Sequence, residues 1–300
     1  MKLLITGAWR EAEKYIPELE AMGHEIAFMR QEASVLPCDP AWVEGVICNG
    51  LFLHHSIEAF PNLRFIQLTS AGYDRVDLDE IRARGIEIRN ARGVYSVPMA
   101  EFAVAGVLQL YKQSRFFYEN QKRRRWEKHR GLLELCGRTV LIVGCGDVGT
   151  ACARRFAAFG CRVIGVNRTL RENPAFDAIH PLCELDALLP EADVVVLTLG
   201  LDASTRYLMN AERLEKVKSG AVLVNLARGA LVDTEALLPA LDRLGGAVLD
   251  VFEEEPIPPD HPLWDKENVL LTPHNSFVGE GDEERLARVI LDSLRKEAIL

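Results

Sequence analysis

The sequence lacks several features that would place it in other classes of protein. It contains no uninterrupted apolar run long enough for a membrane-spanning helix, and Glu101 interrupts its most apolar helical stretch, 97–111. From Met1 the chain runs straight into a strand-like pattern, without the apolar segment of a signal peptide. We therefore expect a soluble protein that resides in the cytoplasm and has no membrane partner.

Disulfides, a metal site and a nucleic-acid partner are not expected either. The seven cysteines include no C-x-x-C pair and lie mostly beside apolar runs, which is typical of reduced thiols in a reducing compartment. The formal net charge is -9, whereas phosphate binding needs clustered cations. We interpret the basic run 122–125 as a solvated helix end, with a polyanion patch as the alternative.

The sequence does have a regular alternation of short apolar runs and amphipathic stretches. This alternation predicts an α/β protein with mostly parallel sheets. A helix is expected over 11–22, and a single long helix over 98–125 is interpreted as a connector that also carries a subunit contact. The expected strands are 2–6, 25–29, 45–48, 65–69 and 86–89, then 139–143, 162–166, 194–198, 221–225, 247–251 and 269–271.

A glycine-rich motif, 144–149, has the pattern G-x-G-x-x-G between the expected strand 139–143 and a helical pattern at 148–159. In this context the glycines allow a tight turn, close approach of the backbone to a pyrophosphate, and helix–strand packing, while the helix N-terminus offers free N–H groups. The alternative is a glycine-rich turn that binds nothing. The dinucleotide-binding residues expected here are Gly144, Gly146, Asp147, Val148 and Gly149.

The end of the next expected strand indicates which dinucleotide is preferred. Sites for NAD usually carry an acid there for the ribose 2′-hydroxyl, but this chain has Asn167, Arg168 and Thr169. An acid would repel a 2′-phosphate, whereas a guanidinium can bind it. We therefore expect NADP(H) to be preferred over NAD(H); the alternative is that Arg168 is merely exposed and NAD is used.

Three further segments follow expected strands, namely 225–233, 249–256 and 271–274. Because the carboxyl ends of parallel strands share one edge of a sheet, an arginine, a glutamate and a histidine can converge there. With 70–74 and the glycine motif, these segments closely resemble the D-isomer-specific 2-hydroxyacid dehydrogenase family over nearly the whole chain. The same resemblance includes 90–93, 98–101 and Trp126.

The resemblance implies a role for each matching residue. Arg228 would bind substrate, His274 would be the acid/base, and Glu255, which directly precedes a proline, would pair with His274. The cofactor would contact Ala227 and Asp250, the latter through the nicotinamide amide; capping of a strand end is the alternative for Asp250. The backbone of Ser70, Ala71 and Gly72 would hold the substrate carboxylate.

The resemblance also implies an architecture and an activity. We expect two doubly wound domains, a flavodoxin-like substrate domain (1–97 plus 275–300) and a Rossmann dinucleotide-binding domain (98–274), in a homodimer. The expected activity is reduction of glyoxylate, hydroxypyruvate or a similar small 2-keto acid. The alternative is a dinucleotide-sensing regulatory protein of the corepressor type. His54 and His55 are interpreted as surface residues, with substrate contact as the alternative.

Overall fold

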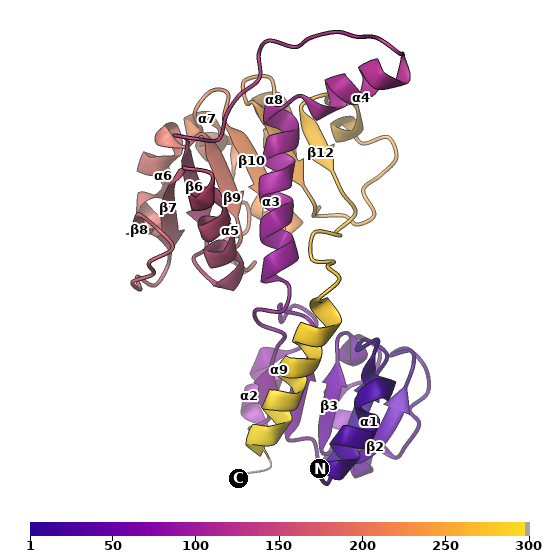
Figure 1. Cartoon of the computed structure of the whole chain (residues 1–300). Helices are drawn as coiled ribbons and strands as arrows, with labels where there is room; N and C mark the ends of the chain where they lie inside the picture. Colours follow the sequence, from indigo (N-terminus) through magenta and orange to yellow (C-terminus); the bar gives the residue numbers. More distant parts are fainter. Residues whose placement is uncertain (298–300) are drawn as a thin grey trace. The chain divides into compact units, whose positions relative to one another are not determined.

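The computed structural model describes residues 1–297 and divides them into two compact units (Figure 1). Unit 1 comprises Met1–Tyr95 and the C-terminal segment that begins at Gly279, and unit 2 comprises Ser96–Val278. The domain boundaries expected after residues 97 and 274 lie a few residues from those observed after Tyr95 and Val278. Each unit contains one parallel sheet, so the expected doubly wound α/β fold class is confirmed.

Unit 1 is built on five parallel strands in the order β2-β1-β3-β4-β5, the flavodoxin-like order. Strands β3 and β4 are buried along their whole length, as expected when helices cover both faces of a parallel sheet. The strands are β1 (Lys2–Thr6), β2 (Glu25–Met29), β3 (Gly45–Cys48), β4 (Phe65–Leu68) and β5 (Glu87–Arg89); the helices are α1 (Ala12–Ala21), α2 (Leu78–Ala83) and α9 (Asp282–Glu297), with short 3-10 helices η1 (Pro40–Trp42), η2 (Leu51–Leu53) and η3 (Ile57–Ala59).

The two ends of the chain meet in the core of unit 1. In Figure 1, α9 lies beside α1 on the same face of the sheet. Ile290 and Leu294 of α9 pack in one cluster with Leu19 of α1 and Phe65 of β4, and all four side chains are fully buried. The C-terminal helix therefore belongs to the hydrophobic core of the N-terminal unit.

Unit 2 contains seven parallel strands in the order β12-β11-β10-β9-β6-β7-β8, which reverses direction between β6 and β9. Open sheets of this kind bind ligands at the carboxyl ends of the strands beside such a reversal. The strands are β6 (Thr139–Val143), β7 (Arg162–Asn167), β8 (Ala178–Pro181), β9 (Val194–Leu197), β10 (Val222–Asn225), β11 (Gly246–Leu249) and β12 (Val269–Leu271).

Helices cover both faces of this second sheet, because successive strand residues point to opposite sides. Along β6, Val140 and Ile142 pack with helices α3 and α5, whereas Leu141 and Val143 belong to the cluster under α7 and α8 (Figure 1). The helices are α3 (Ser96–Tyr111), α4 (Ser114–Lys122), α5 (Asp147–Ala158), α6 (Leu185–Leu188), α7 (Ala211–Lys216) and α8 (Thr234–Ala240), with η4 (Leu182–Glu184), η5 (Leu189–Glu191), η6 (Gly229–Leu231) and η7 (Pro262–Asp265).

The single helix expected over 98–125 is wrong. Gln113 has a left-handed backbone (φ 53°), which ends α3 and lets the chain turn into α4. The backbone N–H of Leu133 donates to the carbonyl of Tyr111, and the Lys112 ammonium donates to the carbonyl of Leu133 (2.7 Å). A returning segment thus satisfies the end of α3, and no proline or glycine marks this break in the sequence.

Smaller differences concern the edges and ends of strands. The edge strand β8, whose residues are all half-buried, was not expected because it contains His180 and ends in Pro181. The strand expected over 247–251 ends at Leu249, so Asp250 belongs to the following loop. Other ends differ by one or two residues. No helix among residues 1–297 combines the length and the apolar character required to cross a bilayer.

Candidate active site

The glycine motif forms a tight turn between β6 and α5. Gly144 has φ 108°, and a Cβ there would lie 2.7 Å from the backbone nitrogen of Leu199. A Cβ on Gly149 would lie 1.9 Å from the carbonyl oxygen of Gly144. By contrast, no atom lies within 4 Å of a Cβ built on Gly146, at the start of α5. Open space beside a helix N-terminus fits the close approach of a pyrophosphate to the backbone.

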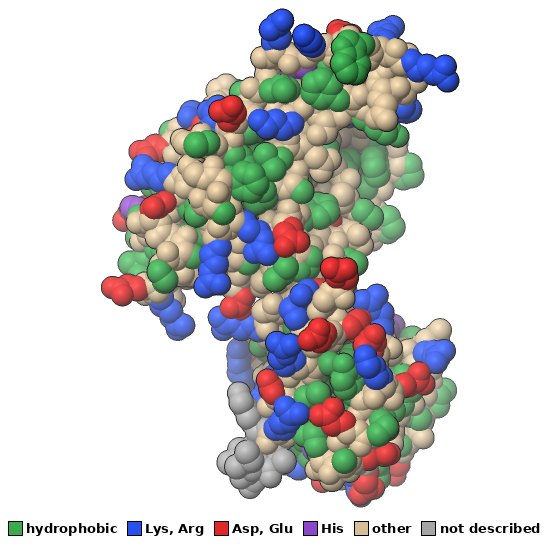
Figure 2. All heavy atoms as spheres, viewed as in Figure 1, with side chains coloured by type: hydrophobic (Ala, Val, Ile, Leu, Met, Phe, Trp, Pro, Cys, Tyr) green, Lys and Arg blue, Asp and Glu red, His purple; other side chains and the backbone are tan. Residues whose placement is uncertain are grey.

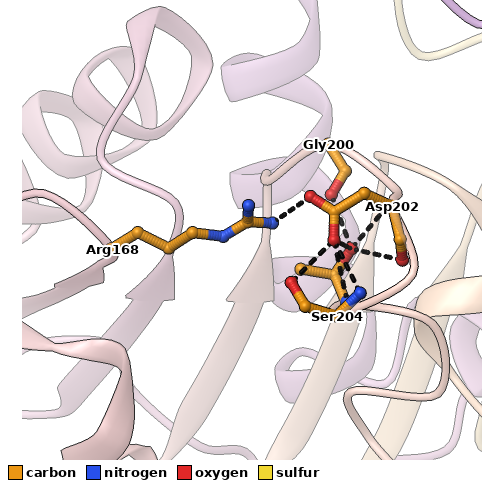
Figure 3. A network of polar contacts seen from close by, with 5 residues as sticks. Arg168, Gly200, Asp202 and Ser204 are labelled. Carbon is orange, nitrogen blue, oxygen red and sulfur yellow. Dashed lines mark hydrogen bonds and ion pairs between the residues drawn. The ribbon is translucent and has the colours of Figure 1, made fainter.

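The segment that follows β7 is exposed at the carboxyl ends of the strands (Figure 3). The side-chain amide of Asn167 donates to the carbonyl of Thr169 (2.9 Å), and the guanidinium of Arg168 forms an ion pair with Asp202. The pKa of the Asp202 carboxyl lies well below its usual range. The largest cause is the hydrogen bonding from Ser204, and the next is the hydrogen bond from the Arg168 guanidinium. Sequence reasoning did not single out Asp202, because its partner is distant in the chain.

The loop after β10 carries Arg228 and is organised by Asn225. The Asn225 side chain accepts from the Ala227 N–H (3.2 Å) and donates to the Arg228 carbonyl (2.9 Å). Gly229 then packs so closely on the next loop that a Cβ would lie 1.9 Å from the carbonyl carbon of Phe252. This contact places the Arg228 loop against the loop that contains the acidic segment Glu253–Glu255.

The acidic segment and the histidine meet at one carboxylate. Nδ1 of His274 lies 2.8 Å from one carboxylate oxygen of Glu255, and the other oxygen accepts from the Phe252 N–H (2.9 Å). Because an ionised carboxylate only accepts, Nδ1 carries the proton and Nε2 is left for another partner. Glu253 instead pairs with Arg206 (2.9 Å), so of these two glutamates only Glu255 contacts the imidazole.

A buried carboxylate holds the backbone around His274. Asp250 is fully buried, and its two oxygens accept from the Thr272 hydroxyl (2.6 Å), the Asn275 N–H (2.8 Å) and the Ser276 N–H (2.9 Å). Its carbonyl accepts from the His274 N–H (2.7 Å). His274 itself has φ 50°, a backbone that costs energy for a residue with a side chain. Asp250 therefore fixes the strained turn from which the imidazole projects, and these bonds are of the strand-end capping kind.

An aromatic ring flanks the histidine on the following turn. The ring of Phe277 meets that of His274 edge-on, with 6.0 Å between the centroids and 84° between the planes. Phe277 is half-exposed.

The loop expected to bind the substrate carboxylate, Ser70–Gly72, lies in unit 1. Ser70 follows β4, and its hydroxyl donates to the Gly72 carbonyl (3.0 Å) while the Asn90 side chain donates to the Ala71 carbonyl (2.6 Å). These hydrogen bonds fix the backbone conformation of the loop. His55 contacts the carbonyl of Glu32 through Nε2 (2.9 Å), a local contact within the same unit.

Comparison with known proteins gives a consistent result. The family model for the NAD binding domain of D-isomer specific 2-hydroxyacid dehydrogenases matches residues 104–276. The glyoxylate reductase of Korarchaeum cryptofilum is 36% identical over 244 residues, which cover 79% of this chain and 74% of that protein.

Two solved structures are similar over nearly the whole chain. A D-isomer specific 2-hydroxyacid dehydrogenase from Xanthobacter autotrophicus, in complex with NADPH and MES, is 30% identical with a TM-score of 0.80 and covers 99% of this chain and 95% of its own. The D-lactate dehydrogenase of Aquifex aeolicus, complexed with NAD and lactic acid, is 25% identical with a TM-score of 0.82 and covers 99% and 96%.

Proposed function

Because this chain belongs to the D-isomer-specific 2-hydroxyacid dehydrogenase family and is an oxidoreductase that acts on CH–OH donors, we propose that it reduces glyoxylate, hydroxypyruvate or a similar small 2-keto acid, with NADP(H) preferred over NAD(H). The observation that carries this proposal is the His274–Glu255 pair at the sheet edge that also carries the Arg228 loop and the glycine turn. Unit 2 is accordingly the dinucleotide-binding domain and unit 1 the substrate domain.

The proposed reaction needs a proton donor and an anion-binding group. A bound reduced nicotinamide supplies the hydride for the keto carbon. Protonated on both ring nitrogens, His274 delivers the Nε2 proton to the carbonyl oxygen and takes it back in the reverse direction, while its Nδ1–H stays bonded to Glu255. Arg228 binds the substrate carboxylate bidentately and stabilises the negative charge that develops on the oxygen.

The remaining contacts follow from the family assignment. The glycine turn (144–149) receives the pyrophosphate, Asn167, Arg168 and Thr169 face the adenosine ribose, and Ala227 and Asp250 lie toward the nicotinamide. The backbone N–H groups of the Ser70–Gly72 loop bind the substrate carboxylate. An arginine at the end of β7, in place of the acid typical of NAD sites, supports the NADP(H) preference.

We also propose that the protein is a homodimer formed through unit 2. A groove of about 700 Å³ is lined by residues of α3, α4 and β12, among them Phe102, Leu110 and Tyr118. The arm 123–138 that follows α4 exposes 98% of Trp126, and Figure 2 shows hydrophobic side chains among Lys and Arg at this outer end of the unit. Light scattering should give twice the chain mass, and Trp126→Ala should favour the monomer; a monomeric wild type would refute this assignment.

The direct test is a spectrophotometric assay with the wild-type protein. NADPH and NADH are tested separately, at the absorbance band of the reduced nicotinamide, against glyoxylate, hydroxypyruvate, pyruvate and phenylpyruvate. We expect fastest oxidation of NADPH with the two small keto acids. A folded sample that binds either dinucleotide but turns over none of the acids would refute the proposal and favour a dinucleotide-sensing regulatory protein.

A further inference from the structure

The ion pair between Arg168 and Asp202 spans the carboxyl end of strand β6 in unit 2. Arg168 follows β7, and Asp202 lies in the loop after β9. Both strands flank β6 in the sheet, and Figure 3 shows the Arg168 side chain extending toward Asp202. An anion that reaches Arg168 therefore meets Asp202 at the same place.

The loop that carries Asp202 is held in place by its own hydrogen bonds. One carboxylate oxygen, Oδ1, accepts from the Ser204 N–H (2.8 Å), the Ser204 hydroxyl (2.7 Å) and the Thr205 N–H (3.1 Å). The buried Thr205 hydroxyl lies 2.8 Å from the Asp202 nitrogen and 3.0 Å from the Gly200 carbonyl oxygen. This network explains why an acceptor is needed at position 202, and an asparagine or serine would supply one equally well.

The turn does not explain the negative charge at this position. The second oxygen, Oδ2, contacts the Arg168 guanidinium. The two side chains are 51% and 45% exposed, so water and ligands reach both partners. Exposed ion pairs of this kind contribute at most about 1 kcal/mol, which leaves them open to exchange with a stronger anion.

We propose that Asp202 limits the preference for NADP(H) by competing with the ribose 2′-phosphate of this cofactor for the Arg168 guanidinium. This inference rests on the proposed function, in which Arg168 faces the ribose. A 2′-phosphate displaces Asp202 from Arg168, and the freed carboxylate then lies near a second anion. NAD(H) has a hydroxyl at this position and leaves the pair intact. The competition reduces, without reversing, the preference for NADP(H), and it persists at neutral pH because the Asp202 carboxyl, with its lowered pKa, stays ionised.

Equilibrium binding to the full chain tests this competition without relying on catalysis. Asp202→Asn keeps the Oδ1 acceptor of the turn and removes the charge, and Asp202→Ser is a second variant with the same property. Both should bind NADPH roughly threefold more tightly than the wild type, within the range of an exposed ion pair, and bind NADH with unchanged affinity. Titration with 2′,5′-ADP and 5′-AMP should give the same contrast, because these probes report the ribose end alone.

Three controls isolate the mechanism. Asp242→Asn removes an exposed charge that pairs with Lys266 (3.0 Å). Asp242 precedes β11 and therefore lies at the amino ends of the strands, away from the proposed cofactor site, so both affinities should be unchanged. In an Arg168→Ala background, Asp202→Asn should lose most of its effect and improve NADPH binding by less than about 1.5-fold. Raising the salt concentration should also shrink the difference, because both partners are exposed.

The possible failures are distinguishable. If the wild type binds neither dinucleotide, the proposed function fails and the inference falls with it. If Arg168→Ala weakens NADPH and NADH equally, Arg168 does not face the 2′-phosphate and the inference is again refuted. If Arg168→Ala weakens NADPH alone but Asp202→Asn changes no affinity, or weakens only NADH, the cofactor site stands and the competition is wrong.

Discussion

Two aspartates in unit 2 have similar hydrogen bonds and different surroundings. Asp250 and Asp202 both follow a strand, and both accept from backbone N–H groups of a turn. Asp250 is fully buried and both its oxygens serve the turn around His274, whereas Asp202 is exposed and has one oxygen in contact with Arg168. The comparison indicates that burial turns such a carboxylate into a fixed support, while exposure leaves it able to exchange partners.

The largest effect is expected at the residue that Asp250 supports. His274→Ala should lower kcat by about a hundredfold or more, because it removes the general acid/base, and leave dinucleotide binding unchanged. Steady-state rates and NADPH titration measure the two quantities. As a control, His261→Ala removes an imidazole that accepts from the Leu263 N–H (3.2 Å) at the start of η7, and should retain activity. Near-normal turnover by His274→Ala would contradict the assignment of the acid/base.

The next effect concerns stability and separates the two aspartates directly. Asp250→Asn places an amide against buried N–H groups that need an acceptor, and should lower the free energy of unfolding by about 2 kcal/mol. Asp202→Asn keeps its turn and should leave the urea midpoint unchanged. Urea unfolding followed by circular dichroism makes the comparison. Equal midpoints for both variants would show that burial does not distinguish them.

A smaller effect is expected at the partner of the histidine. Glu255→Gln keeps an oxygen for the Phe252 N–H but removes the charge beside Nδ1, and should reduce kcat roughly tenfold as part of the general acid–base contribution. Glu254→Gln changes the adjacent side chain in the same way and should be neutral. If the two variants have the same activity, Glu255 is not the residue that positions the imidazole.

The smallest effect is expected at the exposed pair. Arg168→Ala should raise the KM for NADPH roughly fivefold and that for NADH less than twofold, in line with the energies of exposed ion pairs. NADH serves as the internal control, since it lacks the 2′-phosphate. Equal changes in the KM values for the two cofactors would mean that Arg168 supports the loop and does not bind the ribose 2′-phosphate.

The sequence predicted those parts of the fold that follow from local backbone geometry. The glycine turn could be recognised because a Cβ on Gly144 or Gly149 would overlap neighbouring backbone, so these two positions require glycine. The buried strands could be recognised because apolar, β-branched runs are typical of covered parallel sheets. The break at Gln113 could not be recognised, since its reason is a returning segment around Leu133 that satisfies the end of α3.

The sequence by itself determined which kinds of chemical group stand at the carboxyl ends of the strands, because a strand's residues and its exit loop are contiguous in the chain. The tertiary structure alone decided several of the contacts between these groups. Asp250 accepts hydrogen bonds from a turn 25 residues away, and Asp202 pairs with Arg168, 34 residues earlier in the chain. The physical reason is the order of the strands, which places distant segments side by side at one edge of the sheet.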